Sequence, residues 1–167
     1  PDIERRLRLL RNQGMQKQYE NEVIGFNARM SDIHAAIGRV QLTKVDEWTG
    51  MRQQNAAFFD KHLEGVVRPP VAPGAVHVYH QYTVRVPEDR DGFVSALREE
   101  YGVGSGVYSP IPNHRLPSLA RFAPGLDLPE TERAAREVVS LPVHPSLSDE
   151  DRERIVAAVN ALAGAGA

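Results

Sequence analysis

A stretch rich in proline and glycine, at residues 65–74, separates two parts of this chain that have different sequence patterns. Proline fixes φ and has no amide to donate, so this stretch suits neither a helix nor a central strand. We therefore predict three segments. They are a helical arm with a long connecting helix (1–64), a linker (65–75) and a small α+β domain with an antiparallel sheet and packed helices (76–167).

The first part of the chain carries two helical patterns. Apolar residues recur at helical spacing over residues 2–11, and Gly14 is a suitable stop. The second pattern begins at Ser31, whose hydroxyl can cap a helix, and continues to about Leu63. We predict one long helix there and a loop over residues 15–30. A bend in the long helix is expected at one of two glycines, Gly38 or Gly50.

The C-terminal part alternates between strand and helix patterns. Apolar and polar residues alternate at the end of the first predicted strand, and Ser148 with Asp151 forms a capping signal for the last helix. In chain order we expect a strand over 76–86, a helix from Asp89 or Asp91 to Gly102, a short strand over 103–108, a stiff loop over 109–117, a helix over 129–138, a strand over 138–143 and a final helix.

Composition excludes several classes of protein. A formal net charge of -2 leaves no broad basic surface for nucleic acid or an anionic membrane. No apolar run approaches the roughly 18 residues needed to cross a bilayer. The chain has no cysteine, which excludes disulfides and cysteine-bound metals. We expect a cytoplasmic protein. Because residue 1 is proline and not methionine, we expect a processed chain or a fragment.

The segment GFNARMSD, at residues 25–32, places an amide and a guanidinium just before a helix. Asn27 and Arg29 both donate hydrogen bonds, and a loop at the N-terminus of a helix suits an anionic ligand. Two other interpretations remain open. Asn27 can be a turn residue, and Arg29 can form an interface salt bridge.

This segment and the helix after it closely resemble the G-x-N-x-R-M…H-A-A-x-x-x-x-Q-L motif of the DegT/DnrJ/EryC1/StrS family. Its members are pyridoxal-phosphate-dependent aminotransferases that act mainly on nucleotide-linked keto-sugars. The resemblance extends over essentially the whole chain, and it implies the C-terminal part of a fold type I aminotransferase. Further motifs that resemble the family's are R-x-x-R-N-x-G (8–14), H-x-x-H-x-Y (77–82), R-D (90–91), Y-x-P-x-P-x-H (108–114) and S-L-P-x-x-P (140–145).

The resemblance also implies a cofactor, partners and site residues. The complete enzyme would bind pyridoxal 5'-phosphate, take an amino group from a donor such as glutamate or glutamine, and form a homodimer with shared active sites. Asn27 would contact the cofactor phosphate of the neighbouring subunit, and Arg29 would lie near a phosphate of the cofactor or the nucleotide. Tyr108 and His114 would lie on a loop that reaches the sugar nucleotide.

The family's lysine that carries the cofactor lies upstream of the motifs present here. Lys17, Lys44 and Lys61 do not occupy a matching position, so we expect no catalytic residue in this chain and no catalysis by it alone. An alternative is a non-catalytic interaction module, or a split or degenerate subunit of such an enzyme. Relatives with histidine in place of the lysine are dehydratases, and the substrate, donor and stereochemistry stay open.

Several histidines and carboxylates have structural interpretations. A packed corner is the alternative for Tyr108 and His114. We expect His80 and Tyr82 to form a buried polar pair, since residues two apart share one face of a strand. His77 and His80 would lie on opposite faces, so no metal site is expected. His34 and the carboxylates at helix starts, such as Glu132, are expected to serve helix structure.

Overall fold

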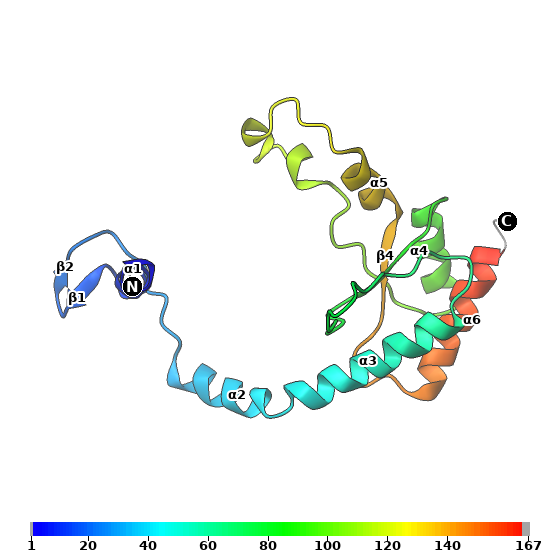
Figure 1. Cartoon of the computed structure of the whole chain (residues 1–167), viewed down its shortest axis with the longest axis horizontal. Coiled ribbons are helices and arrows are strands. Elements are labelled where there is room, and N and C mark those ends of the chain that lie inside the picture. Colours follow the sequence, from blue (N-terminus) through cyan, green and yellow to red (C-terminus); the bar gives the residue numbers. More distant parts are fainter. Residues whose placement is uncertain (1, 165–167) are drawn as a thin grey trace. The chain divides into compact units, whose positions relative to one another are not determined.

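The computed structural model describes residues 2–164 (Figure 1), and the chain divides into two compact units, Pro1–Val45 and Asp46–Ala167. The fold is α+β, as the sequence predicts. The division into segments 1–64, 65–75 and 76–167 that the sequence predicts stays a prediction.

The first unit begins with α1 (Asp2–Arg11), which confirms the first predicted helix. A small antiparallel hairpin follows, made of β1 (Met15–Lys17) and β2 (Glu20–Asn21), where the sequence predicted a loop. Side-chain amides hold it: Asn12 Nδ2 donates to Met15 O at 3.0 Å, and Asn21 Nδ2 donates to Gln13 O at 2.7 Å. The prediction of a loop was therefore wrong for these strands, which are too short and polar to show alternation, whereas residues 22–30 do form a loop.

The predicted long helix consists of two helices, α2 (Asp32–Leu42) and α3 (Val45–His62). Ser31 caps α2 as predicted, with its Oγ accepting from the backbone N of His34 at 3.3 Å. The interruption lies at Thr43 and Lys44, and not at either glycine. Thr43 Oγ1 donates back to Val40 O at 2.9 Å, a bond of the kind that bends or ends helices.

The second unit is built on a two-stranded antiparallel sheet, with Tyr82 of β3 (Tyr82–Arg85) opposite Leu141 of β4 (Val138–Leu141). Its helices include the predicted ones, α4 (Arg90–Glu99), α5 (Pro129–Glu137) and α6 (Asp149–Gly164), and the short 3-10 turns η1 (Asn113–Arg115) and η2 (Ala120–Phe122) lie between α4 and α5.

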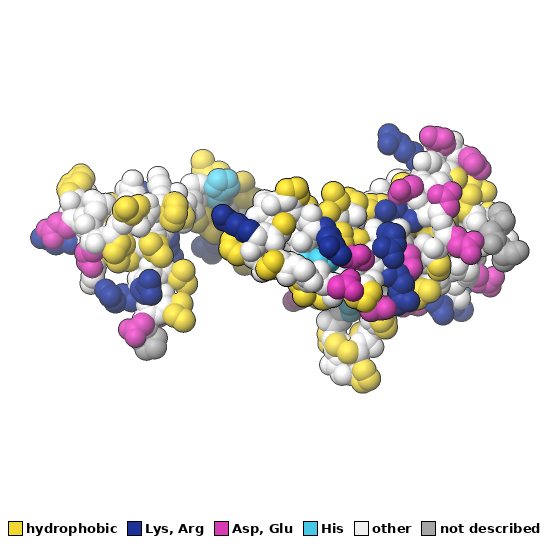
Figure 2. Space-filling model, turned by 90° about the horizontal axis from the view of Figure 1, so that it is seen from above, with side chains coloured by type: hydrophobic (Ala, Val, Ile, Leu, Met, Phe, Trp, Pro, Cys, Tyr) yellow, Lys and Arg dark blue, Asp and Glu magenta, His cyan; other side chains and the backbone are white. Residues whose placement is uncertain are grey.

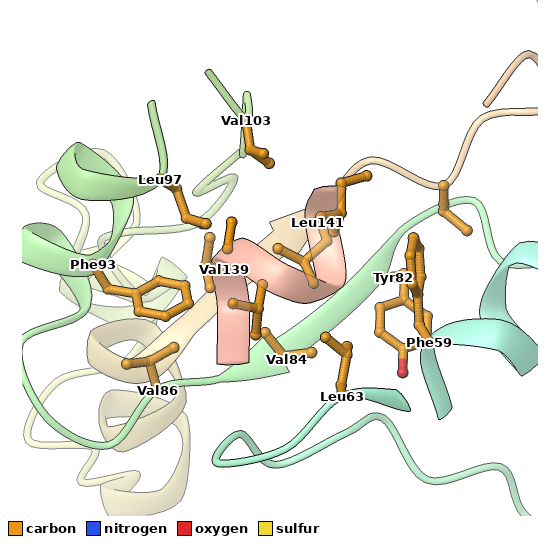
Figure 3. Packing of buried hydrophobic residues seen from close by; sticks show 14 of the residues in the cluster. Phe59, Leu63, Tyr82, Val84, Val86, Phe93, Leu97, Val103, Val139 and Leu141 are labelled. Atoms are coloured by element: carbon orange, nitrogen blue, oxygen red, sulfur yellow. The ribbon is translucent and has the colours of Figure 1, made fainter. Parts of the chain in front are cut away.

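The hydrophobic core lies between this sheet and helices α3, α4 and α6. Figure 3 shows Phe93 and Leu97 of α4 pointing toward Val139, and Phe59 of α3 beside Tyr82. The rings of Phe59 and Tyr82 meet edge to face, with their centroids 5.2 Å apart. Ile155 and Val159 of α6 are buried in the same cluster.

Two strand predictions in this unit were too long. The first strand occupies only Tyr82–Arg85, because the chain takes a left-handed turn at Tyr79, where φ is 45°. The short strand expected over 103–108 is reduced to one bridge between Gly106 and Ser140. Alternating side-chain types in these segments therefore do not correspond to continuous pairing with a neighbouring strand.

Candidate functional site

The loop that carries the predicted site residues of the first unit is fixed to the end of α1 by its backbone. The amide of Phe26 donates to Leu10 O at 2.7 Å, and the amide of Gln13 donates to Phe26 O at 2.8 Å. The amide of Ala28 then donates to Arg11 O at 2.9 Å. Two sequence motifs, at 8–14 and 25–30, therefore form one local structure.

Two glycines allow this close approach. Gly14 has a φ of +77°, and a Cβ on it would lie 1.7 Å from the backbone oxygen of Val23. A Cβ on Gly25 would lie 2.2 Å from the backbone nitrogen of Gly14. Any larger residue at position 25 would push the loop away from α1, so both glycines help to place Asn27.

Asn27 and Arg29 are both exposed, and Arg29 Nε donates a hydrogen bond to Asn27 Oδ1 at 3.2 Å. This bond uses the amide's acceptor and leaves the Nδ2 hydrogens to donate elsewhere. The start of α2, whose backbone amides favour negative charge, follows directly after Ser31. The arrangement suits an anionic oxygen.

Arg29 also lines an open hollow of about 630 Å³ in the first unit. Arg5, Arg8 and Arg11 of α1 line the same hollow, which makes it strongly basic. Glu4 pairs with Arg8 at 2.9 Å. Within residues 2–164 no salt bridge is formed by the other three arginines, so the hollow is suited to attract anions.

In the second unit, Tyr108 and His114 have very different environments. The exposed fraction of Tyr108 is 69%, whereas that of the His114 side chain is only 6%. His114 Nε2 lies 3.1 Å from Oε1 of Glu132 in α5. The loop therefore leaves Tyr108 exposed, while His114 fastens the loop to α5.

Glu132 is a residue whose role sequence reasoning missed, because it was assigned to the start of a helix only. Its Oε1 also accepts from Arg115 Nε at 2.8 Å. The pKa of the Glu132 carboxyl is held below its ordinary value by the hydrogen bond from Arg115 first and by that from His114 second. These partners are 17 and 18 positions away, a separation at which sequence carries no periodic signal.

The predicted buried pair of His80 and Tyr82 is wrong. His80 is exposed and precedes the strand, whereas Tyr82 is fully buried and donates from its hydroxyl to Asp60 Oδ1 at 2.7 Å. Burial and this hydrogen bond both raise the pKa of the Tyr82 hydroxyl. His77 lies outside the strand as well, and its Nδ1 accepts from the amide of Tyr79 at 2.8 Å.

Asn27 and Arg29 belong to the first unit, and Tyr108 and His114 belong to the second. The structure thus brings each pair into one local region. Across residues 2–164 no group of three or more histidine and acidic side chains is arranged to hold a metal ion. In the same part of the chain, no helix combines the length and the apolar character that crossing a membrane requires.

This chain spans less than half the length of the curated relatives that it matches. The model of the DegT/DnrJ/EryC1/StrS aminotransferase family matches residues 1–160. A dTDP-3-amino-3,4,6-trideoxy-alpha-D-glucose transaminase of Streptomyces venezuelae is 37% identical over 95% of this chain, which spans 42% of that protein.

Solved structures give the same picture. The crystal structure of S. venezuelae DesV in complex with a ketimine intermediate has a TM-score of 0.88 and 36% identity, over 98% of this chain and 44% of that one. NtdA of Bacillus subtilis with bound cofactor PMP has a TM-score of 0.83 and 26% identity, over 93% of this chain and 38% of that one. The matched region is the C-terminal portion of such aminotransferases. On these findings, the chain belongs to the DegT/DnrJ/EryC1/StrS aminotransferase family.

Proposed function

We propose that the complete protein is a pyridoxal-phosphate-dependent aminotransferase that moves an amino group from glutamate or glutamine to a nucleotide-linked keto-sugar. The reaction would belong to amino-sugar or natural-product biosynthesis. The observation that carries the proposal is the Asn27–Arg29 pair, set on a loop that Gly14 and Gly25 hold against α1. Similarity to a dTDP-amino-sugar transaminase supports this substrate class.

Asn27 fits the cofactor's phosphate. Its Oδ1 is engaged by Arg29, so the Nδ2 group is left as a donor. Bound pyridoxal phosphate supplies the electron sink for amino transfer. The role of Asn27 is to hold the phosphate, while the lysine that carries the cofactor lies outside this chain. A relative with bound PMP supports this choice of cofactor.

Arg29, Tyr108 and His114 serve the substrate in this proposal. The guanidinium of Arg29 borders a basic hollow and is suited to a phosphate of the nucleotide. Tyr108 offers an exposed ring and hydroxyl to the sugar nucleotide. His114 belongs to the same loop, and its buried side chain anchors the loop to Glu132 of α5.

We also propose that the complete enzyme is a homodimer with shared sites. Helix α2 has no buried residue, and three apolar side chains on it are exposed at helical spacing: Ile33, Ile37 and Val40. Figure 2 shows hydrophobic side chains scattered among polar and charged ones on the surface in view. The exposed apolar row on α2 suits burial against other protein. A cytoplasmic location completes the proposal, in keeping with a sequence that has no cysteine.

The proposal is tested with the complete protein, pyridoxal phosphate, an amino donor and a panel of nucleotide-linked keto-sugars. Mass spectrometry of the products would detect replacement of the keto oxygen by an amino group. We expect transfer to at least one substrate, with nitrogen from ¹⁵N-labelled donor found in the sugar. Loss of water from the sugar without uptake of label would instead indicate a dehydratase, and the absence of any reaction would favour a non-catalytic module.

A further inference from the structure

The loop that carries Tyr108 is fastened to the α5–β4 segment at both of its ends. At the first end, the amide of Gly106 donates to Ser140 O at 2.9 Å, and the amide of Ser140 donates to Gly106 O at 2.8 Å. At the second end, Glu132 of α5 binds both His114 and Arg115. Tyr108 lies between these two attachment points.

The loop has little else to hold it. The hydrophobic core described within residues 2–164 includes no residue from 106–128. Pro110 and Pro112 limit the conformations between the attachment points, so a shift at His114 is passed along a stiff segment. The position of Tyr108 therefore depends on a few polar contacts, of which Glu132 makes two.

The α5–β4 segment is itself rigidly supported. Arg90 is only 9% exposed, and its Nη1 donates to Val138 O at 2.8 Å and to Ala135 O at 3.2 Å. Arg85 and Glu137 form a second link between the strand β3 and the end of α5. Glu132 is thus a fixed point from which a loop can be oriented.

We propose that Glu132 is a positioning residue for the sugar-nucleotide site: through His114 and Arg115 it orients the loop that presents Tyr108 to the substrate. This inference rests on the proposed function. A single carboxylate oxygen accepts from both partners, so removing Glu132 releases the whole end of the loop at once. Because Glu132 lies outside the core, its loss should alter the loop without unfolding the domain.

The test compares Glu132→Ala with Glu130→Ala in the complete protein. Glu130 is exposed on the same turn of α5 and pairs only with Arg133 of its own helix within the described residues, so it is a matched control. We expect Glu132→Ala to raise the KM for the keto-sugar nucleotide roughly tenfold or more, the scale of a lost hydrogen bond to a charged group. The KM for the amino donor should not change. Glu132→Gln keeps a hydrogen-bond acceptor, so its KM for the keto-sugar nucleotide should lie between those of wild type and Glu132→Ala.

Two further measurements separate positioning from folding. Hydrogen exchange in peptides covering 106–120 should be faster in Glu132→Ala and unchanged in Glu130→Ala, whatever the substrate. Combined with Tyr108→Ala, the Glu132 change should add little to the KM, since both act through the same ring. If Glu132→Ala and Tyr108→Ala raise the KM additively, the proposal is overturned. It is also overturned if Glu132→Ala speeds the exchange but leaves the KM unchanged. A wild-type protein inactive on every such sugar overturns the proposed function and this inference with it.

Discussion

Arg29 and Asn27 are joined by a hydrogen bond from Nε to Oδ1, 3.2 Å long, on a loop whose backbone is bound to the end of α1. The bond fixes which side of the amide remains free to donate. A side chain that is oriented before its ligand arrives loses less conformational freedom on binding. The pair therefore explains why an amide and a guanidinium are spaced two residues apart in this loop.

The first prediction concerns Asn27. In the complete protein, Asn27→Ala should weaken cofactor binding by roughly ten- to a hundredfold, because a hydrogen bond to a charged acceptor contributes about 1.5–3 kcal/mol. Titration of the apoprotein with pyridoxal phosphate measures this. Gln16→Ala, which removes another exposed side-chain amide of the first unit, is the control and should leave the affinity unchanged. Equal affinities for wild type and Asn27→Ala would remove Asn27 from the phosphate site.

Gly25→Ala should disrupt the first unit. The added Cβ meets backbone atoms of Gly14, Gln13 and Leu10 at 2.2–2.8 Å, and none of these can move without breaking the loop's hydrogen bonds. Gly38→Ala is the matched control, because a Cβ there meets nothing within 4 Å inside α2. We expect faster amide exchange over residues 10–28 in the first variant only. Unchanged protection in Gly25→Ala would contradict the described packing.

Tyr82→Phe should destabilise the second unit by about 1.5–3 kcal/mol, because the hydroxyl hydrogen bond to the Asp60 carboxylate is lost. Tyr79→Phe is the control: the Tyr79 hydroxyl makes no hydrogen bond within residues 2–164, although the ring packs against Tyr82. Denaturant unfolding of the three proteins gives the comparison. A similar loss in both variants would show that the hydrogen bond between Tyr82 and Asp60 makes no special contribution to stability.

The stabilising contribution of Asp151, at the start of α6, should decrease in acid. The amide and hydroxyl of Ser148 donate to Asp151, which lowers the pKa of that carboxyl below its ordinary value of 3.8. A lowered native pKa stabilises the fold above the unfolded pKa, and this contribution is lost as the pH falls through the native value. Denaturant unfolding should therefore show wild type more stable than Asp151→Asn at pH 6, with a smaller difference near pH 3. A constant difference would mean that the carboxylate's charge is not involved.

Sequence patterns predicted α1, α4, α5 and α6, since their caps and apolar spacing act within one or two turns of helix. They did not predict the end of α2 at Thr43, where a hydroxyl competes for a helix carbonyl. They also extended the strand back to residue 76, because alternation does not reveal the left-handed turn at Tyr79. Local signals thus predict helices better than they predict pairing between distant segments.

The same limit applies to the candidate site. The spacing of Asn27 and Arg29 places them in one loop, and the structure adds the hydrogen bond between them. The partner of His114 was not predictable, because Glu132 lies in another element and resembles an ordinary residue of a helix's first turn. Long-range polar contacts of this kind depend on the folded chain.

The central claim is that this chain completes the active site of a sugar aminotransferase across a subunit interface. Its most direct test mixes two full-length variants, one without the cofactor-binding lysine expected upstream and one carrying Asn27→Ala. Assays would use a cofactor concentration at which each variant alone is inactive. If the site is shared, one site in each mixed dimer regains both groups, and transaminase activity should partly return. No recovery after verified subunit exchange would contradict the claim.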